Sequence, residues 1–169
     1  MSTKVVIVGG VAGGATAATR IRRLDEDAEI IVFERSGYVS YANCGLPYYI
    51  GDVITDQEEL TLATPESFFS RFHIYMKVNH EVTAINTKRK TISVKNLNTG
   101  EVFEESYDKL LLSPGAKPTQ PKLPGLGIDK LFTLRTVEDT LRIKEYINKH
   151  KIKSVVLAGG GFIGLELAE

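Results

Sequence analysis

The sequence of 169 residues predicts an α/β fold: a parallel sheet with inserted strands. Three patterns along the chain support this prediction. Val5–Val8 is apolar and β-branched at every position, as in a buried parallel strand. It leads through a glycine-rich turn, residues 9–14, into a run of good helix formers. The same order of apolar run, glycine turn and helix start returns at 154–169. Between them, residues 74–112 change to a period near two, which predicts inserted strands.

The first of these units has the pattern of a dinucleotide-binding site. A second apolar run, Ile30–Phe33, ends on Glu34, twenty residues after Gly14. In such a site glycines let the backbone approach a pyrophosphate, a helix N-terminus stabilises its charge, and the acid bonds a ribose. The G-x-G-x-x-G alignment from Gly9 departs at one place, where Val11 replaces the second glycine. We therefore predict a Rossmann-like unit, the alternative being a plain glycine-rich turn between strand and helix.

Caps and turns place the elements that follow. Thr64 and Pro65 are typical of an N-cap and a first helical residue, which predicts a short helix to about Arg71. The expected strands are Ile74–Val78, Glu81–Ile85, Thr91–Lys95, Val102–Ser106 and Lys109–Leu112. A hairpin around Asn98–Gly100 joins the third and fourth of these, so a β-meander is inserted in the first unit.

A boundary follows at 114–124, which holds four of the six prolines. Thr136 can then cap a helix from Val137 to about His150, and Ser154–Ala158 is a further apolar strand. After it, Gly159, Gly161 and Gly164 fit G-x-G-x-x-G fully, and Leu165 starts a helix. We expect a nucleotide-binding domain at 1–115, a proline-rich linker with its helix at 116–150, and the truncated start of a second nucleotide-binding domain at 151–169. Nineteen residues cannot bury a core, so we expect the chain to be a fragment.

Composition excludes several classes of partner. Twenty-one basic and twenty-one acidic residues give no net charge, so nothing indicates nucleic acid binding. No apolar run reaches membrane-spanning length, and we expect no membrane partner. The three histidines lack metal-ligand spacing, so we expect no metal site. One cysteine and no export signal indicate a cytoplasmic protein.

That single cysteine, Cys44, lies in the stretch S-Y-A-N-C-G-L-P-Y at 40–48. It cannot form a disulfide within the chain, so a redox role needs a small-molecule thiol, an oxidant or another chain. The ordinary alternative is a small buried hydrophobic residue. Asn43, Gly45 and Pro47 indicate a turn instead. A helix beginning near Cys44 would direct amide groups at a thiolate and stabilise it.

The first helix is expected to carry a basic face. Thr16, Arg20 and Arg23 are spaced i, i+4, i+7 and therefore share one side. The apolar side is formed by Ala18, Ile21 and Leu24. Two guanidinium groups can hold phosphates bidentately, whereas the alternative is a solvated basic surface.

Taken together, these residues resemble the flavin- and pyridine nucleotide-dependent disulfide reductases, and within them the single-cysteine members that act on coenzyme A disulfide. The matching stretches are V-I-V-G-G-V-A-G-G-A at 6–15, the Cys44 stretch, Y-D-K-L-L-L-S-P-G-A at 107–116, Leu134-Arg135 and the second glycine motif. Val11 also occurs in this subfamily's version of the first motif. The resemblance implies FAD at the first motif, NAD(P)H at the second, Cys44 at the flavin ring, and a homodimeric full-length protein.

The activity implied by the resemblance is reduction of coenzyme A disulfide by NAD(P)H through FAD and a Cys44–coenzyme A mixed disulfide. The implied catalytic residues are Cys44 and Asn43. The implied FAD residues are Gly9, Gly10, Val11, Ala12, Gly13, Glu34, Arg35, Val82, Ser113, Pro114, Gly115 and Arg135. The implied NAD(P)H residues are Gly159, Gly161, Phe162, Ile163 and Gly164. The implied coenzyme A residues are Thr16, Arg20, Arg23, Ser40, Asn43 and Arg71.

Three alternatives to this activity remain. A reductase of coenzyme A persulfide or polysulfide uses much the same scaffold and is the closest. NADH oxidases and peroxidases cycle through a cysteine sulfenic acid, but they carry a histidine where this chain has Ala12. A non-catalytic flavin-binding module is the third. Members with a C-x-x-x-x-C pair are excluded, because position 49 is Tyr.

Overall fold

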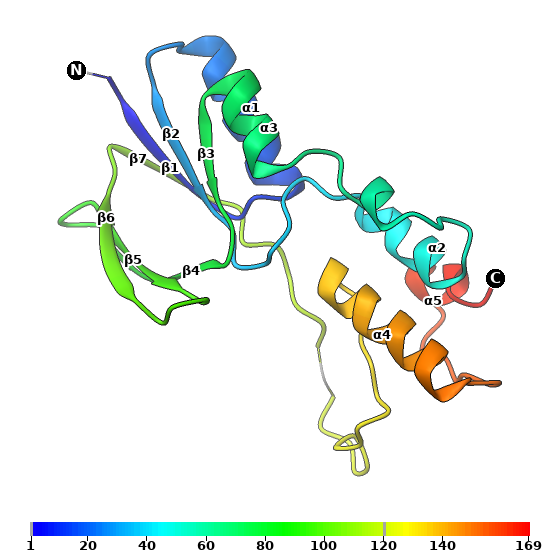
Figure 1. Cartoon of the computed structure of the whole chain (residues 1–169). Helices are drawn as coiled ribbons and strands as arrows, with labels where there is room; N and C mark the ends of the chain where they lie inside the picture. Colours follow the sequence, from blue (N-terminus) through cyan, green and yellow to red (C-terminus); the bar gives the residue numbers. More distant parts are fainter. Residues whose placement is uncertain (1, 120) are drawn as a thin grey trace. The chain divides into compact units, whose positions relative to one another are not determined.

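The structure is a computed structural model that describes residues 2–119 and 121–169 (Figure 1). The chain forms two compact units. Unit 1 comprises Met1–Tyr41 and Thr61–Gly115, and unit 2 comprises Ala42–Leu60 and Ala116–Glu169. The Cys44 segment therefore groups with residues after 115 and not with the first glycine motif. The domain assignment 1–115, 116–150 and 151–169 stays a prediction.

Unit 1 is built on a parallel sheet, as the sequence predicted. Its four strands are β1 (Lys4–Val8), β2 (Glu29–Phe33), β3 (Ile74–Lys77) and β7 (Lys109–Leu112), in the order β3-β2-β1-β7. Val8 lies in register with Phe33 on one side and with Leu112 on the other. Because the strands are parallel, the residues that follow these three lie at one edge of the sheet. The α/β, Rossmann-like fold class is thereby confirmed.

Both faces of the two central strands, β1 and β2, are buried, which explains why these strands are apolar without alternation. On one face Ile7, Ile30 and Ile74 pack with α1 (Ala12–Leu24) and α3 (Pro65–Phe72). On the other face Val6, Ile31 and Phe33 pack against Ile92 and Val94 of the inserted sheet. Successive side chains of a strand point to opposite faces, so one short apolar run serves two cores.

The predicted meander is present. β4 (His80–Asn86), β5 (Thr91–Asn96) and β6 (Val102–Ser106) form an antiparallel sheet in the order β4-β5-β6. The register of β4 shifts between Val82 and Ala84, which marks a bulge. The Asn96 side chain accepts hydrogen bonds from the amides of Asn98 and Thr99 and so closes the β5–β6 turn.

The helices of unit 1 differ from expectation at two places. α1 begins at Ala12, inside the glycine motif, and not after it. Leu24, expected on the apolar side, is 70% exposed because α1 ends there. The remaining apolar residues behave as predicted, since Ala18 is buried and Ile21 packs against the core. The N-terminus of α3 is capped by a capping box between Thr64 and Ser67.

Unit 2 is mostly helical. It contains the 3₁₀ turns η1 (Asn43–Gly45) and η2 (Gln57–Leu60) and the helices α2 (Leu46–Ile50), α4 (Val137–His150) and α5 (Phe162–Glu166). α2 packs against α4 and α5. Leu46, Leu60 and Val137 are fully or almost fully buried. Within the described residues no helix is long and apolar enough to cross a membrane.

The strand expected at Ser154–Ala158 is wrong for this structure. These residues form no strand, and Val155 and Val156 are 64% and 92% exposed. A strand needs a partner for its backbone amides and carbonyls, and no described segment pairs with this one. The helix after it begins at Phe162, three residues before the predicted start.

Candidate functional site

The carboxyl edge of the parallel sheet gathers the first predicted nucleotide residues. Gly9 follows β1, Glu34 follows β2 and Ser113 follows β7. The Gly9 amide donates to the Phe33 carbonyl at 2.8 Å, and the Ser113 amide donates to the Val8 carbonyl at 2.7 Å. In the sheet, β1 lies between β2 and β7. The strand order changes direction at β1, and open α/β sheets bind ligands at the carboxyl edge beside such a switch point.

The glycine loop is shaped for close backbone approach. Gly9 has a φ of +99°, and a Cβ there would overlap the Ser113 carbonyl oxygen. A Cβ on Gly13 would overlap the Ser113 hydroxyl in the same way. Val11 is the N-cap of α1 and supplies no side-chain hydrogen bond, and the first turn holds no acid. The first amides of α1 therefore remain suited to an anion, which fits the pyrophosphate of a dinucleotide.

Glu34 links this loop to the end of β2. Its Oε2 accepts a hydrogen bond from the Gly10 amide at 2.7 Å, and its Oε1 accepts one from the Ser36 amide at 2.8 Å. A carboxylate offers about four acceptor positions, so both oxygens retain capacity for a ribose hydroxyl. The geometry fits the role predicted for Glu34 and adds a second one, because the same side chain holds the loop in place.

The other residues predicted at FAD take several positions. Arg35 is exposed and lies 3.7 Å from the Glu81 carboxylate of β4. Val82 packs on the core between the two sheets. Pro114 is exposed, and Gly115 has a φ of +69°. Arg135 belongs to unit 2, so the predicted set is divided between the units.

The second glycine motif repeats the loop geometry of the first. Gly159 has a φ of +116°, and a Cβ on Gly164 would lie 2.5 Å from the Gly159 carbonyl oxygen. In the first motif, a Cβ on Gly14 would overlap the Gly9 carbonyl in the same manner. Gly161 is the N-cap of α5, and Phe162 and Ile163 are exposed. The loop is thus consistent with a second nucleotide, although its preceding strand is not formed.

Cys44 is exposed, so the alternative of a small buried hydrophobic residue is wrong. It occupies the middle of the single turn η1, which runs directly into α2. Gly45 beside it is buried, and a Cβ there would lie 3.2 Å from the Ile54 side chain. The buried glycine and the exposed thiol are thus adjacent on the same turn.

Arg135 joins the Cys44 turn to the segment before α4. Its Nη1 donates to Asn43 Oδ1 at 2.9 Å, immediately before the cysteine. The sequence assigned Arg135 and Asn43 to separate roles, and it contained no signal for this contact across 92 positions. A small cavity of unit 2 opens beside the pair. It is lined by Asn43, Leu46, Pro47, Leu134, Arg135 and Ile163.

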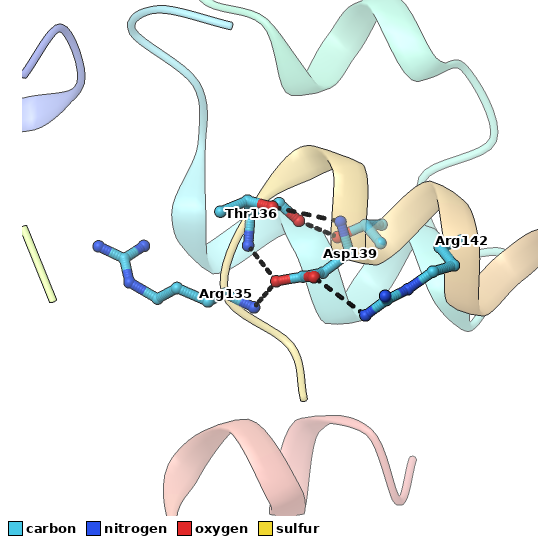
Figure 2. A network of polar contacts seen from close by, with 5 residues as sticks. Arg135, Thr136, Asp139 and Arg142 are labelled. Carbon is cyan, nitrogen blue, oxygen red and sulfur yellow. Dashed lines mark hydrogen bonds and ion pairs between the residues drawn. The ribbon is translucent and has the colours of Figure 1, made fainter. Parts of the chain in front are cut away.

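The backbone of Arg135 is held by the cap of α4, as Figure 2 shows. Asp139 Oδ2 accepts hydrogen bonds from the amides of Arg135 at 3.1 Å and Thr136 at 3.2 Å. The Thr136 hydroxyl accepts one from the Asp139 amide at 3.2 Å, which completes a capping box. Arg142 lies 3.3 Å from the other oxygen of Asp139.

The predicted basic face is present on α1. Thr16, Arg20 and Arg23 are all exposed. Arg23 Nε donates to the Thr19 carbonyl at 3.3 Å, while Arg20 forms no hydrogen bond or ion pair within the described residues. Arg22, which the sequence did not single out, has a different task. Its guanidinium donates to the carbonyls of Phe72 at 2.8 Å and His73 at 3.1 Å and thereby joins α1 to the end of α3.

Two further residues of the predicted coenzyme A set also lie in unit 1. Ser40 has a φ of +48°, and its amide donates to the Gly10 carbonyl at 3.1 Å, which places it against the glycine loop. Arg71 is exposed, with its guanidinium 5.3 Å from the centre of the Phe72 ring. Asn43, with Cys44, lies in unit 2. The assignment of this set to coenzyme A stays a prediction.

Comparison with known proteins agrees with these features. The family model of the pyridine nucleotide-disulphide oxidoreductases matches residues 3–169. A coenzyme A disulfide reductase of Staphylococcus aureus (strain bovine RF122 / ET3-1) is 49% identical over 98% of this chain and 37% of its own length. The chain thus spans little more than a third of the curated relatives it matches.

Two solved structures share the fold over nearly the whole chain. Reduced Bacillus anthracis CoADR-RHD has a TM-score of 0.97 at 53% identity, covering 100% of this chain and 30% of that one. A NAD-dependent persulfide reductase from A. fulgidus has a TM-score of 0.92 at 35% identity, covering 98% and 31%. With its two glycine loops and, between them in the sequence, an exposed cysteine, the chain belongs to the pyridine nucleotide-disulphide oxidoreductase family.

Proposed function

We propose that the full-length protein reduces coenzyme A disulfide to coenzyme A, with Cys44 as its redox-active nucleophile. One observation carries the proposal. The chain's lone cysteine is exposed on a single turn, in a sequence 49% identical to a coenzyme A disulfide reductase. A buried cysteine would have contradicted a nucleophilic role, because an attacking thiolate must reach its disulfide.

The cofactors of this proposal are FAD and NAD(P)H. When bound, they supply the two electrons that reduce a disulfide. Gly9, Gly13 and Glu34 would hold the ADP half of FAD, with the α1 amides at its pyrophosphate. Gly159, Gly161 and Gly164 would hold NAD(P)H, and the persulfide reductase with which this chain shares 35% identity is described as NAD-dependent.

The chain's own chemistry centres on the Cys44 thiolate. It attacks one sulfur of coenzyme A disulfide, forms a Cys44–S–S–coenzyme A bond and expels the other coenzyme A as its thiolate. Two electrons and one proton then release the second coenzyme A as a thiol and regenerate the Cys44 thiolate. Asn43 and Ser40 would position the substrate near the sulfur, while Thr16, Arg20, Arg23 and Arg71 would contact its phosphates.

Three attributes of the full-length protein belong to the same proposal. We expect it to be a homodimer, to have no nucleic acid or membrane partner and to be cytoplasmic. Sedimentation of the purified full-length protein tests the first of these. Fractionation of the producing cells tests the last.

Replacement of Cys44 by Ser in the full-length protein tests the function. The variant should retain its FAD but lose reduction of coenzyme A disulfide, because serine cannot form the mixed disulfide. Mass spectrometry of the oxidised unsubstituted protein should find coenzyme A bound to Cys44. A Cys44→Ser protein with full activity would overturn the proposal.

Reduction of coenzyme A persulfide or polysulfide is the second candidate. The 35% identity and TM-score of 0.92 to a persulfide reductase favour it specifically. The two functions share the Cys44 nucleophile and differ in the leaving group, which is coenzyme A thiolate in one and hydrosulfide in the other. The ratio of kcat/KM for the disulfide to that for the persulfide in the full-length enzyme decides between them.

A further inference from the structure

The Cys44 turn and α2 are held at both ends by side chains from one stretch of unit 2, residues 135–144. At the first end, Arg135 donates to Asn43 Oδ1. At the other end, Lys144 Nζ donates to the Ile50 carbonyl at 2.8 Å and lies 2.5 Å from Asp52 Oδ1. Both contacts start from α4 or the residues just before it.

Lys144 is well placed to hold α2. Its side chain is only 14% exposed, and its ammonium lies 5.8 Å from the centre of the Tyr49 ring. The Ile50 carbonyl lies in the last turn of α2, where carbonyl groups have no hydrogen-bond partner within the helix. The lysine ammonium also interacts favourably with the negative, C-terminal end of the helix dipole. A helix of five residues is marginal by itself, so α2 depends on such contacts for its position.

The first contact is itself supported from α4. Asp139 fixes the backbone of Arg135 through the hydrogen bond to its amide, which leaves the guanidinium directed at Asn43. A chain of hydrogen bonds therefore runs from Asp139 through Arg135 to the residue preceding Cys44. Neither Asp139 nor Lys144 is found in any predicted set of cofactor or substrate residues.

We propose that α4 acts as a two-point clamp on the Cys44 turn, with Asp139 and Lys144 as positioning residues for the Cys44 thiol. This inference rests on the proposed function, in which Cys44 is the nucleophile. Neither residue is assigned a contact with substrate. The clamp would fix the direction of the Cys44 side chain, so its loss should lower kcat and leave KM nearly unchanged.

The test compares three lysine variants of the full-length protein. Lys144→Met removes both contacts at the end of α2, and Lys144→Arg keeps donors for the Ile50 carbonyl and Asp52. Lys149→Met is the matched control, because Lys149 is an exposed lysine of the same helix with no polar partner within the described residues. Each variant is measured for kcat and KM and for the rate at which iodoacetamide alkylates Cys44 in the reduced protein.

Lys144→Met should lower kcat about tenfold with KM within about twofold, and should raise the alkylation rate about threefold as the turn loosens. Lys144→Arg should restore kcat and the alkylation rate most of the way to the values of the unsubstituted protein, and Lys149→Met should match that protein in both. Wild-type kcat and alkylation in Lys144→Met would overturn the clamp. Failure of Lys144→Arg to rescue would also overturn it, because bulk packing alone would then explain the effect.

Two additions keep the outcome decisive. If Lys144→Met does not fold, Asp52→Asn removes only the ion pair at a side chain that is 76% exposed, and it should give the same changes at smaller size. If the unsubstituted enzyme does not reduce coenzyme A disulfide, the proposed function fails. The alkylation rates then still decide whether the clamp exists.

Discussion

At the scale of single residues, the shape of the first glycine loop depends on contacts with neighbouring residues and not only on the glycines in the motif. Gly9 has no room for a Cβ because Ser113, more than a hundred positions later in the chain, lies against it. Gly14 has no room for a Cβ because the carbonyl oxygen of Gly9 lies against it. The motif therefore reports contacts between β1, α1 and the end of β7.

The first prediction concerns Gly9. In the full-length protein, Gly9→Ala should leave less than about a tenth of the normal bound FAD, because a φ of +99° costs about 1–3 kcal/mol and the methyl also overlaps the Ser113 carbonyl. Gly100→Ala is the matched control, with a φ of +78° and no atom within 4 Å of the added Cβ. It should keep its FAD. Flavin absorbance of the purified proteins measures both, and equal FAD in the two variants would contradict the prediction.

Sequence spacing found Glu34 but not all of its partners. The distance from Gly14 predicts an acid after the second strand, and the structure places it at the loop. That the same carboxylate also accepts from Gly10 and Ser36 depends on side-chain conformation, which no spacing contains. Lys144 was missed for a related reason, since a lysine on a charged helix looks the same whether it is solvated or caps a distant carbonyl.

At the scale of elements, the arginines of α1 differ in what they contact. Arg22 is committed to carbonyls at the end of α3, whereas Arg20 and Arg23 face outward. Helical periodicity predicted the face of Arg20 and Arg23 correctly, because those positions are fixed by the geometry of a single helix. It could not predict the task of Arg22, which depends on where another element ends.

The second prediction follows for that face. In the full-length enzyme, Arg20→Ala and Arg23→Ala should each lower kcat/KM for coenzyme A disulfide roughly tenfold to a hundredfold, the value of a hydrogen bond to a charged phosphate. The loss should shrink for a disulfide that lacks the 3′-phosphate. Arg89→Ala, an exposed arginine paired with Glu104 in the meander, serves as the control. Equal losses on both substrates would show that the face only keeps α1 solvated.

The third prediction concerns the junction of β1 with the meander. Lys4 Nζ lies 2.6 Å from the Glu105 carboxylate and 3.5 Å from that of Glu29. The hydrogen bond to Glu105 raises the pKa of Lys4 above 10.5, and partial burial opposes this. A lysine with a raised pKa contributes stability that is fully present below its ordinary pKa and is lost as the pH rises through the raised value.

Lys4→Met should therefore lower the free energy of unfolding by about 0.5–1.5 kcal/mol at neutral pH. The difference from the unsubstituted protein should shrink as the pH rises above 10.5. Thermal unfolding of the full-length proteins across this range measures it. Lys95→Met, an exposed lysine of β5, should show no such pH dependence, and a constant deficit in Lys4→Met would attribute the effect to lost packing alone.

At the scale of the whole molecule, the first unit was predictable and the last segment was not. Apolar runs predicted β1, β2 and β7, and a period near two predicted β3; all four form because each has a neighbouring strand within the chain. Ser154–Ala158 has the same composition and no neighbour, and it forms no strand. Composition indicates a tendency, but pairing decides the strand. The sequence did not predict that residues 42–60 form one unit with residues 116–169, because this grouping depends on packing between segments distant in the chain.

The fourth prediction tests that difference. The chain covers 37% of the length of its curated relative, and in the full-length protein we expect Ser154–Ala158 to pair as a parallel strand before the second glycine loop. Hydrogen exchange of the full-length protein should then show slow exchange at the amides of Val155, Val156 and Leu157. In the 169-residue chain the same amides should exchange rapidly. Rapid exchange in both would contradict the expectation.

The link between Glu34 and the amides of Gly10 and Ser36 has a consequence for the rate of cofactor uptake. These hydrogen bonds belong to the chain itself, so the loop loses its conformational entropy when unit 1 folds and not when the nucleotide arrives. Association should then proceed as a single diffusive encounter with a preorganised surface, without a slow ordering step that becomes independent of nucleotide concentration. The rate of cofactor dissociation should be set by the contacts that break between the loop and the ligand, and not by local unfolding of the loop.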